Sequence, residues 1–384
     1  ISVDGKSWID PSGNDITLSG PPAKLVNLSA ANVKTEKGSN IDIRGGGNLY
    51  AFRWIEGNGG KNDILASNNS FAIIPKYGFD YAPFAPFNNS GDPSLIPIGQ
   101  TGYVNDTLKV GDVVTLGASD GLAAGEYTLL PARYALLPGA FLVTPQSGLP
   151  VGTVKRPDGS TLVSGYRSNT LNPARKGPTL VSQFEIASRK VVKTRSEYED
   201  LLANDVLLKA AIAQESVVPR LPIDSGYLSF SATGKISIAG GVKSKVPKDS
   251  IGRGSLIDIN SPGNVLINKS GTGGAADDLV LQASVLNRLN AESLLIGGLR
   301  SFTPGGVTVA VNADNLTLDN AGAKLLGPDI ILVAKSRVTL DKNSQIEATG
   351  EKAALDNITL GQATAGSGDG ALVRVSGNRS GGVP

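Results

Sequence analysis

A short apolar–Thr–Leu phrase recurs at nearly constant intervals toward the C-terminal end of this chain. It occurs at 315–319 (NLTLD), 337–341 (RVTLD) and 357–361 (NITLG), so its leading apolar residues are 22 and 20 residues apart. Each interval holds short strands bounded by Gly, Asn, Asp or Ser, which is too little chain to enclose a core. Successive intervals bury a core only if they stack, with equivalent strands about 4.8 Å apart. The repeat therefore predicts an all-β protein built on a right-handed parallel β-helix, which is a solenoid.

An antiparallel β-sandwich is the alternative fold for a chain with short strands and frequent turns. Sandwich hairpins commonly carry tight Asn-Gly or Asp-Gly turns between paired strands, and such turns are sparse in this sequence. The recurrence near 20 residues favours the solenoid. Antiparallel hairpins throughout 307–360 would instead favour the sandwich.

Further short strands are predicted on both sides of a central region with a different composition. Candidate strands lie at 16–18, 33–35, 41–43, 228–230, 236–238, 307–311 and 330–333. Three successive glycines at 45–47 adopt backbone conformations that are barred to other residues, so a sharp corner is expected there.

One helix is predicted between the two β-rich regions. Ser196 and Glu199 form a capping box, and apolar residues then recur at helical spacing to about Glu215. A solenoid coil has no place for such a helix, so the helix indicates an insertion. We predict β-helix coils at 1–65 and 227–384, and between them an extra-helical inserted domain at 66–226. This insertion is expected to contain short strands and one α-helix at about 196–215.

The stretch 124–143 repeats Leu-Leu-Pro at an interval of seven residues, ending at Pro131 and Pro138. Proline lacks the N–H that a sheet ladder needs, so it is confined to edges, strand starts or bulges. Strands are predicted at 108–116, 125–130 and 132–143. The paired leucines are expected to form a small core of their own.

An aromatic, proline-rich segment precedes these strands. Residues 71–87 (FAIIPKYGFDYAPFAPF) hold closely spaced prolines, so an extended loop is predicted rather than a regular element. Aromatic faces stack on sugars and partner side chains, and a loop stiffened by proline loses little entropy on binding. We predict a receptor-binding surface formed by Tyr77, Phe79, Tyr81, Phe84, Phe87, Arg133 and Tyr134. The alternative is that these rings form the core of the insertion. Arg167 in 165–168 (GYRS) also lies beside a tyrosine, a composition typical of interfaces.

Composition excludes several kinds of chemistry. The 384 residues include no Cys, His or Met, which excludes disulfides, Cys-ligated zinc, thiol nucleophiles and histidine bases. A net charge of +2 provides no field that would attract nucleic acid. The sequence contains no secretory leader and no run of about 20 apolar residues. Because it also lacks an initiator Met, we expect an internal piece of a longer polypeptide.

Three stretches resemble the filamentous haemagglutinin-like exoproteins of bacterial two-partner secretion. Residues 38–54 (GSNIDIRGGGNLYAFRW) resemble a phrase common in their giant members, 125–143 resemble their inserted module, and 307–360 resemble their β-helix shaft. The resemblance implies an internal shaft segment with an extra-helical domain, in an adhesin that is secreted and displayed on the bacterial cell surface. It implies export by an outer-membrane transporter, a receptor on host cells, bacteria or polysaccharide, and roles in biofilms and virulence.

A polysaccharide-cleaving enzyme, a lyase or a hydrolase, is the alternative function. Several β-helix enzymes use clustered carboxylates with Arg or Lys. Asp277 and Asp278 are adjacent carboxylates, but neighbours on a strand point to opposite faces, so a joint role would require a turn there. Asp369 lies in a Gly-Asp-Gly sequence that is similar to calcium-binding repeats, yet it occurs there once. We therefore predict that the chain is not an enzyme and has no catalytic residue, cofactor or metal site.

Overall fold

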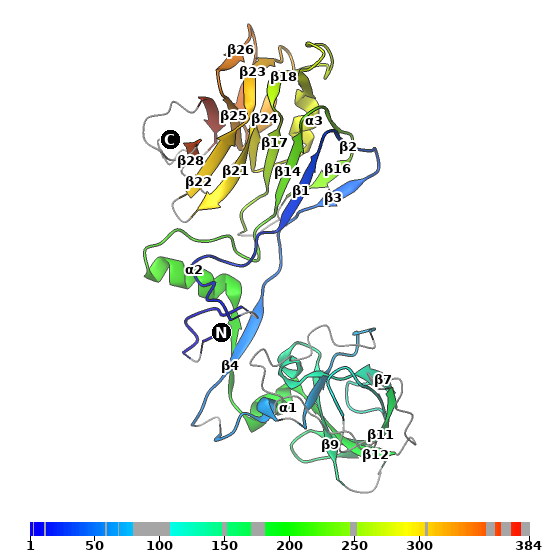
Figure 1. Cartoon of the computed structure of the whole chain (residues 1–384). Coiled ribbons are helices and arrows are strands. Elements are labelled where there is room, and N and C mark those ends of the chain that lie inside the picture. Colours follow the sequence, from blue (N-terminus) through cyan, green and yellow to red (C-terminus); the bar gives the residue numbers. More distant parts are fainter. Residues whose placement is uncertain are drawn as a thin grey trace. The chain divides into compact units, whose positions relative to one another are not determined.

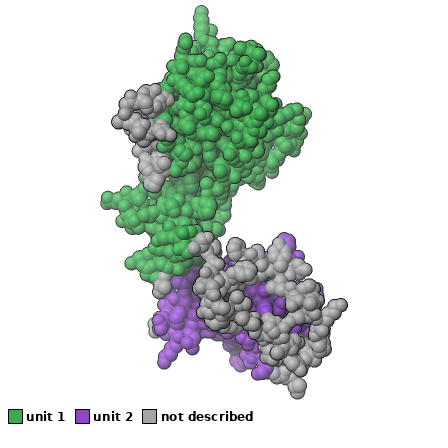
Figure 2. Space-filling model, in the orientation of Figure 1, with its two compact units in different colours: residues 1–51, 201–384 green, residues 52–200 purple. Residues whose placement is uncertain are grey.

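The computed structural model describes residues 1–2, 4–10, 13–57, 60–67, 69–79, 108–147, 152–169, 181–245, 252–303, 306–350, 358–361 and 370–377. Strands predominate within these residues, which confirms the all-β class. The chain forms two compact units, unit 1 (Ile1–Ala51 and Leu201–Pro384) and unit 2 (Phe52–Asp200), coloured separately in Figure 2. The units divide at 51/52 and 200/201, whereas the sequence predicted boundaries at 65/66 and 226/227. In the described part of the chain, no helix has the length and hydrophobicity needed to span a bilayer.

The largest sheet of unit 1 joins strands from across the whole chain (Figure 1). Its order is β1 (Leu25–Ala30), β14 (Tyr227–Ala232), β17 (Leu256–Asn260), β20 (Ser293–Ile296), β25 (Asp329–Ala334) and β29 (Ala371–Ser376). The first five strands are parallel and in register, and β29 is antiparallel to β25. Phe230, Ile259, Ile296 and Leu332 consequently form one row of side chains that faces a common apolar core.

Smaller sheets enclose the same core from other sides. They pair β2 (Val33–Thr35) with β15 (Ile236–Ile238), β3 (Asn40–Asp42) with β16 (Gly241–Lys243), and β24 (Leu325–Gly327) with β27 (Ile346–Ala348), and join β19 (Leu279–Gln282), β18 (Gly263–Asn268), β23 (Ala313–Asp319) and β26 (Arg337–Leu340). All of these pairings are parallel. Val33, Val265, Leu316 and Leu325 contribute to the core, and burial of each such side chain stabilises the fold by about 1.5–3 kcal/mol.

A second apolar layer covers the outer face of the main sheet. It contains β21 (Gly298–Thr303), β22 (Gly306–Val311) and β28 (Ile358–Leu360), with β21 antiparallel and β28 parallel to β22. In β25, Ile330 and Leu332 face the central core, whereas Ile331 and Val333 contact this second layer. The continuous apolar run of β25 follows from this arrangement, because both of its faces are buried.

The repeated phrase occupies three strands, but these strands do not form one ladder. β23 and β26 pair in parallel with Leu316 opposite Val338, as a stack of equivalent strands requires. The third phrase lies in β28, which pairs with β22 and not with β26. On its other side β23 pairs with β18, where Val265 lies opposite Leu316. The phrase therefore predicts the positions of three strands, but of the pairings between them only that of β23 with β26 is formed.

The predicted helix at 196–215 begins later in the structure. Ser196 accepts a hydrogen bond from Nε1 of Trp54 at 2.8 Å and is therefore occupied by a tertiary contact. Residues that follow it form β13 (Tyr198–Leu202), which pairs with β4 (Tyr50–Trp54), and the helix is α2 (Ala203–Ala213). The described residues also contain α1 (Arg189–Arg195), capped by Ser188, and α3 (Ala283–Arg288), so one helix was too few.

Unit 2 is built on one antiparallel sheet. Its order is β7 (Gly125–Thr128), β6 (Val113–Leu116), β11 (Thr161–Asn169), β12 (Ser182–Ser188), β9 (Phe141–Gln146), β5 (Phe71–Ile73) and β8 (Leu130–Pro131), with β10 (Val154–Lys155) beside β11. The two end strands, β7 and β8, are separated by Leu129 alone, so the sheet curls round on itself as a small barrel. Side chains that include Phe71, Val163 and Phe184 fill its core.

Some predictions of local structure agree with the structure and others do not. Pro131 lies in the terminal strand β8, where its missing N–H is tolerated, and Pro138 lies in a turn. Residues 71–73 were predicted as loop but form the buried strand β5, because their apolar side chains complete the barrel core. Residues 16–18 were predicted as a strand but form a turn, in which Thr17 donates to the carboxylate of Asp15.

Candidate functional site

The first half of the candidate site follows β5 directly. A turn reverses the chain after Ile74, where the N–H of Tyr77 donates to the carbonyl of Ile74 at 2.8 Å. The rings of Tyr77 and Phe79 then pack edge to face with centroids 5.5 Å apart. The carbonyl of Phe79 accepts a hydrogen bond from the hydroxyl of Thr128 on β7. This segment is therefore fixed at both ends, while the Phe79 ring stays 57% exposed.

The second half lies on the short 3₁₀ helix η3 (Ala132–Leu136). Ala135 and Leu136 are fully buried and anchor η3, which leaves Arg133 exposed on its outer side. The guanidinium of Arg133 lies over the ring of Tyr134 at 5.4 Å from its centroid, within cation–π range. Arg189 of α1 donates to the carbonyl of Leu136 at 2.6 Å and so holds η3 in place.

Both halves adjoin the same strand. Tyr77 and Phe79 are continuous with β5, and η3 packs against β5 and β9. The remaining predicted residues, Tyr81, Phe84 and Phe87, lie outside the described residues. Phe79 is exposed, whereas Phe71, Phe141 and Phe184 lie in the core of the barrel.

Arg167, which was considered as an interface residue, is buried. Its side chain is 7% exposed and lies 3.9 Å from the carboxylate of Asp112, itself 3% exposed. This arginine supports the barrel and does not contribute to the surface.

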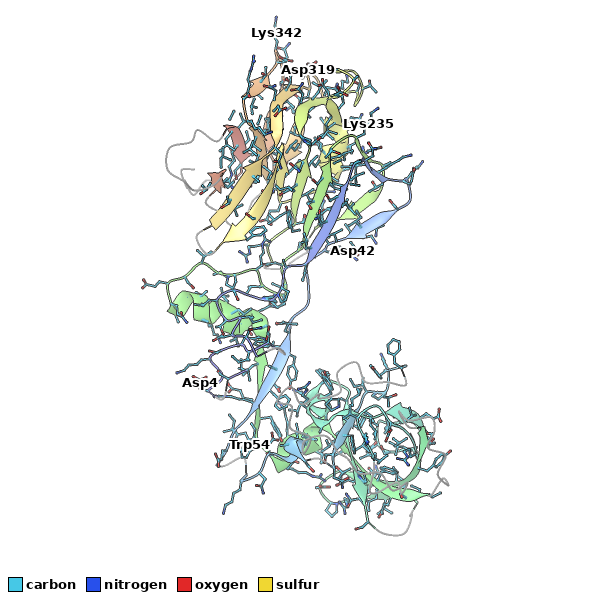
Figure 3. The ribbon with its side chains drawn as sticks, viewed as in Figure 1. Asp4, Asp42, Trp54, Lys235, Asp319 and Lys342 are labelled. Carbon is cyan, nitrogen blue, oxygen red and sulfur yellow. The ribbon has the colours of Figure 1, made fainter. Side chains whose placement is uncertain are left out.

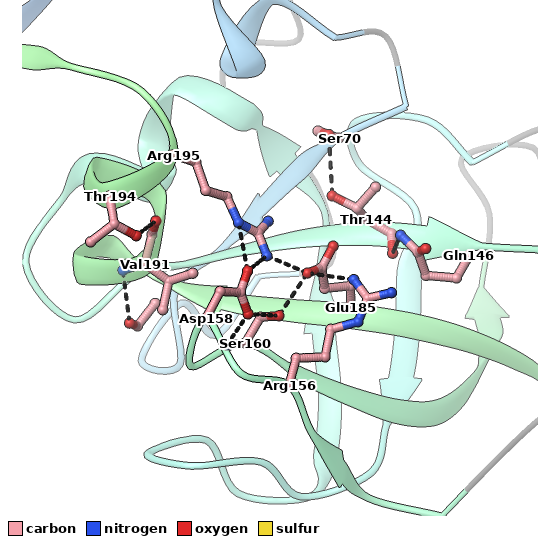
Figure 4. A network of polar contacts seen from close by, with 11 residues as sticks. Ser70, Thr144, Gln146, Arg156, Asp158, Ser160, Glu185, Val191, Thr194 and Arg195 are labelled. Carbon is pink, nitrogen blue, oxygen red and sulfur yellow. Dashed lines mark hydrogen bonds and ion pairs between the residues drawn. The ribbon is translucent and has the colours of Figure 1, made fainter. Parts of the chain in front are cut away.

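A cluster of charged residues in unit 2 was not anticipated from the sequence. Arg195 of α1 contacts the carboxylates of both Asp158 and Glu185, and Arg156 lies 3.0 Å from Glu185 on its other side (Figure 4). The hydroxyl of Ser160 donates to both carboxylates at 2.7 Å. The cluster therefore fastens α1 to the barrel strands. The available signal was a glutamate between the apolar residues Phe184 and Ile186.

Protonation of these two carboxylates is disfavoured. Hydrogen bonds from Arg195 and from the backbone and hydroxyl of Ser160 lower the pKa of Asp158. Burial alone would raise the pKa of Glu185, but the hydrogen bonds from Arg195 and Ser160 outweigh it and lower that pKa. Both groups are ionised at neutral pH and accept hydrogen bonds already, so neither is suited to act as a general acid.

We expect unit 2 to lose stability in acid through this cluster. Because both folded-state pKa values lie below the ordinary 3.8 and 4.5, the stabilisation is complete above about pH 5 and is lost as pH falls through the folded-state values. Replacing Arg195→Gln should flatten this pH dependence between about pH 5 and 3, measured by thermal melting. Lys155→Gln, in an exposed ion pair with Asp120, is the matched control and should leave the profile unchanged. Identical profiles for Arg195→Gln and the unsubstituted protein would contradict this assignment.

Of the carboxylate pair considered for catalysis, Asp278 is engaged within its own loop and Asp277 does not line the neighbouring groove. Asp278 accepts hydrogen bonds from the backbone of Ala275 at 2.8 Å and from Asn264 at 3.2 Å, so it stabilises its own loop. A groove of about 510 Å³ lies beside it, and Asp278 is the one carboxylate among the described residues that line it. The described residues contain no cluster of carboxylates arranged to hold a metal ion, and Asp369 lies outside them.

Comparisons with known proteins identify no relative, so the function of the site has to be argued from its own geometry. No family model, no curated protein and no solved structure matches this sequence or fold.

Proposed function

We propose that this chain is a segment of a large, secreted bacterial adhesin displayed on the cell surface, with unit 1 as elongated scaffold and unit 2 as binding surface. The observation that carries the proposal is the pairing of β1, β14, β17, β20 and β25, which are parallel and in register although they come from distant parts of the chain. The stretches that resemble filamentous haemagglutinin-like exoproteins fall in both units.

Unit 1 is proposed to be a right-handed parallel β-helix. Its parallel sheets share one core, and each strand contributes a side chain to a row that continues on the next strand. Such stacking is what a coil of about 20 residues needs in order to bury its apolar face. Right-handed crossovers are the rule between parallel strands of one sheet, which supports the proposed hand.

Unit 2 is proposed to carry the receptor contact. Phe79 and Arg133 are exposed on segments that are fixed by hydrogen bonds and buried anchors, so binding would immobilise little additional chain. Aromatic rings and arginine are the side chains most enriched among residues that dominate binding energy. The partner would be a host cell, another bacterium or a matrix polysaccharide, and an outer-membrane transporter would export the full-length protein.

We further propose that the chain acts without catalysis or cofactor. Asp158 and Glu185 are held ionised by arginines, and Asp278 is engaged within its loop. A polysaccharide-cleaving activity would need a carboxylate able to donate a proton beside a bound sugar. Release of unsaturated or reducing sugar from acidic polysaccharides by the purified chain would overturn this part of the proposal.

We expect Phe79→Ala and Arg133→Ala to weaken binding to whole cells or to a glycan array by about tenfold or more, as truncation of a dominant contact does. Phe302→Ala is the matched control, because Phe302 is a comparably exposed ring in unit 1 and should leave binding unchanged. Melting temperatures of all three variants should stay close to that of the unsubstituted protein. If both unit 2 variants bind as well as the unsubstituted protein, the proposed binding surface is wrong.

A further inference from the structure

One end of unit 1 presents three strand edges side by side. Within the described residues, β1, β2 and β3 are terminal strands of their sheets, and each pairs on one side only, with β14, β15 and β16 respectively. Figure 1 shows them as the blue strands at one edge of the unit. Open edges of this kind offer unpaired N–H and C=O groups to another strand.

The hydrogen-bond register identifies which groups face outward on β1. The N–H of Tyr227 donates to the carbonyl of Lys24 at 2.8 Å, with Leu25 opposite Tyr227. Backbone groups alternate in direction along a strand, so the N–H groups of Asn27 and Ser29 point to the open side. By the same rule the open side of β2 carries the N–H of Lys34, and that of β3 carries the N–H of Asp42, since Val33 and Ile43 bond inward.

The interior of this end is incompletely covered. Val26, Leu28 and Ile41 pack against the central core yet remain half-exposed, whereas Leu228 and Phe230 in the next layer are fully buried. Leu25 at the start of β1 is 53% exposed. Apolar side chains beside open strand edges favour a further layer of strands as the covering partner.

We propose that the layer is supplied by a second copy of this chain, related by a two-fold axis that passes through the middle of β1. The axis reverses strand direction, so β1 of each copy pairs antiparallel with the other, with Asn27 opposite Asn27. The same rotation places β2 of one copy against β3 of the other, in the register that sets the outward N–H of Lys34 opposite that of Asp42. Val26 of one copy then covers Leu28 of the other, and the interface closes with two molecules.

Charge complements this arrangement. Lys34 on β2 lies against Asp42 on β3 of the second copy, and the two-fold axis creates this contact twice. In the single chain Lys34 pairs with Glu36 at 2.6 Å and Asp42 with Arg44 at 2.7 Å, all of them exposed. Exposed pairs of this kind exchange partners at little cost, and Figure 3 shows Asp42 on the outer strand β3.

Sedimentation velocity of the whole 384-residue chain over a range of concentrations tests the proposal. We expect a reversible monomer–dimer equilibrium without larger species. Ser29→Pro removes an outward N–H and leaves the inward bonds of β1 intact, so it should abolish the dimer while the circular dichroism spectrum is unchanged. Lys34→Glu and Asp42→Lys should each weaken the dimer about fivefold, and their combination should restore it.

Leu340→Pro is the matched control, because Leu340 lies on β26, a terminal strand elsewhere in unit 1. It should leave the dimer unchanged. A chain that is monomeric at every concentration would overturn the proposal. Open-ended polymers that Leu340→Pro disrupts would overturn it as well, since they would indicate head-to-tail stacking.

Discussion

Replacing Arg300→Ala is expected to destabilise unit 1 by about 3–5 kcal/mol, because it leaves a buried carboxylate without its counter-ion. Arg300 on β21 lies 2.7 Å from Asp258 on β17, and the two side chains are 2% and 0% exposed. Asp258 also accepts hydrogen bonds from the backbone N–H of Arg300 at 2.8 Å and from the hydroxyl of Tyr227 at 2.7 Å. Urea unfolding monitored by circular dichroism measures the loss.

The expected effect is large because the Asp258–Arg300 pair is buried. An exposed ion pair in the same unit serves as the control for burial. Lys324 and Glu347 lie 2.8 Å apart at an exposed site in the same unit, so Lys324→Ala should cost about 1 kcal/mol or less. The double replacement Asp258→Leu with Arg300→Met should recover most of the loss, because it removes both charges together. A cost for Arg300→Ala as small as that for Lys324→Ala would contradict the buried-charge argument.

A larger polar network extends from this pair across the main sheet. Arg300 also donates to the hydroxyl of Ser293 at 3.0 Å, Ser293 donates to Asp329 at 2.6 Å, and Arg374 on β29 lies 2.8 Å from Asp329. The network thus links the outer-layer strand β21 and the antiparallel edge strand β29 to the parallel strands of the main sheet. The outer strand β21 is thus held to the main sheet by ionic contacts on a face that is otherwise apolar.

Strands of unit 1 were predictable because their signals are local. Short apolar runs or alternations bounded by turn-forming residues identify β2, β14, β15, β22 and β25. Pairing partners were less predictable, as the third repeated phrase demonstrates. Its three residues suit any strand with one buried face, and packing on Val307 and Val309 selects β22 as the neighbour.

The start of the predicted helix was wrong because the residues of its capping signal make a tertiary contact. Ser196 and Glu199 have the spacing of a capping box, but the indole of Trp54, distant in sequence, occupies the serine hydroxyl. Charged clusters were missed because they have no local signal. Asp258 and Arg300 are 42 residues apart, and no motif links them. An aspartate in the middle of the apolar run 256–260 was the one available hint of a buried partner.

The candidate site was predicted in part. Composition identified an aromatic segment and an arginine beside a tyrosine, and the structure places Phe79 and Arg133 at the surface of unit 2. Composition did not distinguish exposed rings from buried ones within the same segment. Phe71 and Phe79 are eight residues apart, yet Phe71 is 3% exposed because it lies on a strand of the barrel whereas Phe79 lies beyond its end.

Because Phe184 is buried and Phe79 is exposed, replacing each with alanine is expected to cost unit 2 very different amounts of folding free energy. Phe184→Ala removes a fully buried ring from the barrel core and should cost about 3–5 kcal/mol of folding free energy. Phe79→Ala should cost about 0.5 kcal/mol or less, as surface substitutions do. In a Trp8→Phe background, Trp54 of unit 2 is the remaining tryptophan, so its fluorescence during urea unfolding reports this unit (Figure 3). Similar losses for the two alanine variants would mean that Phe79 belongs to the core, and the proposed binding surface would then lose its central residue.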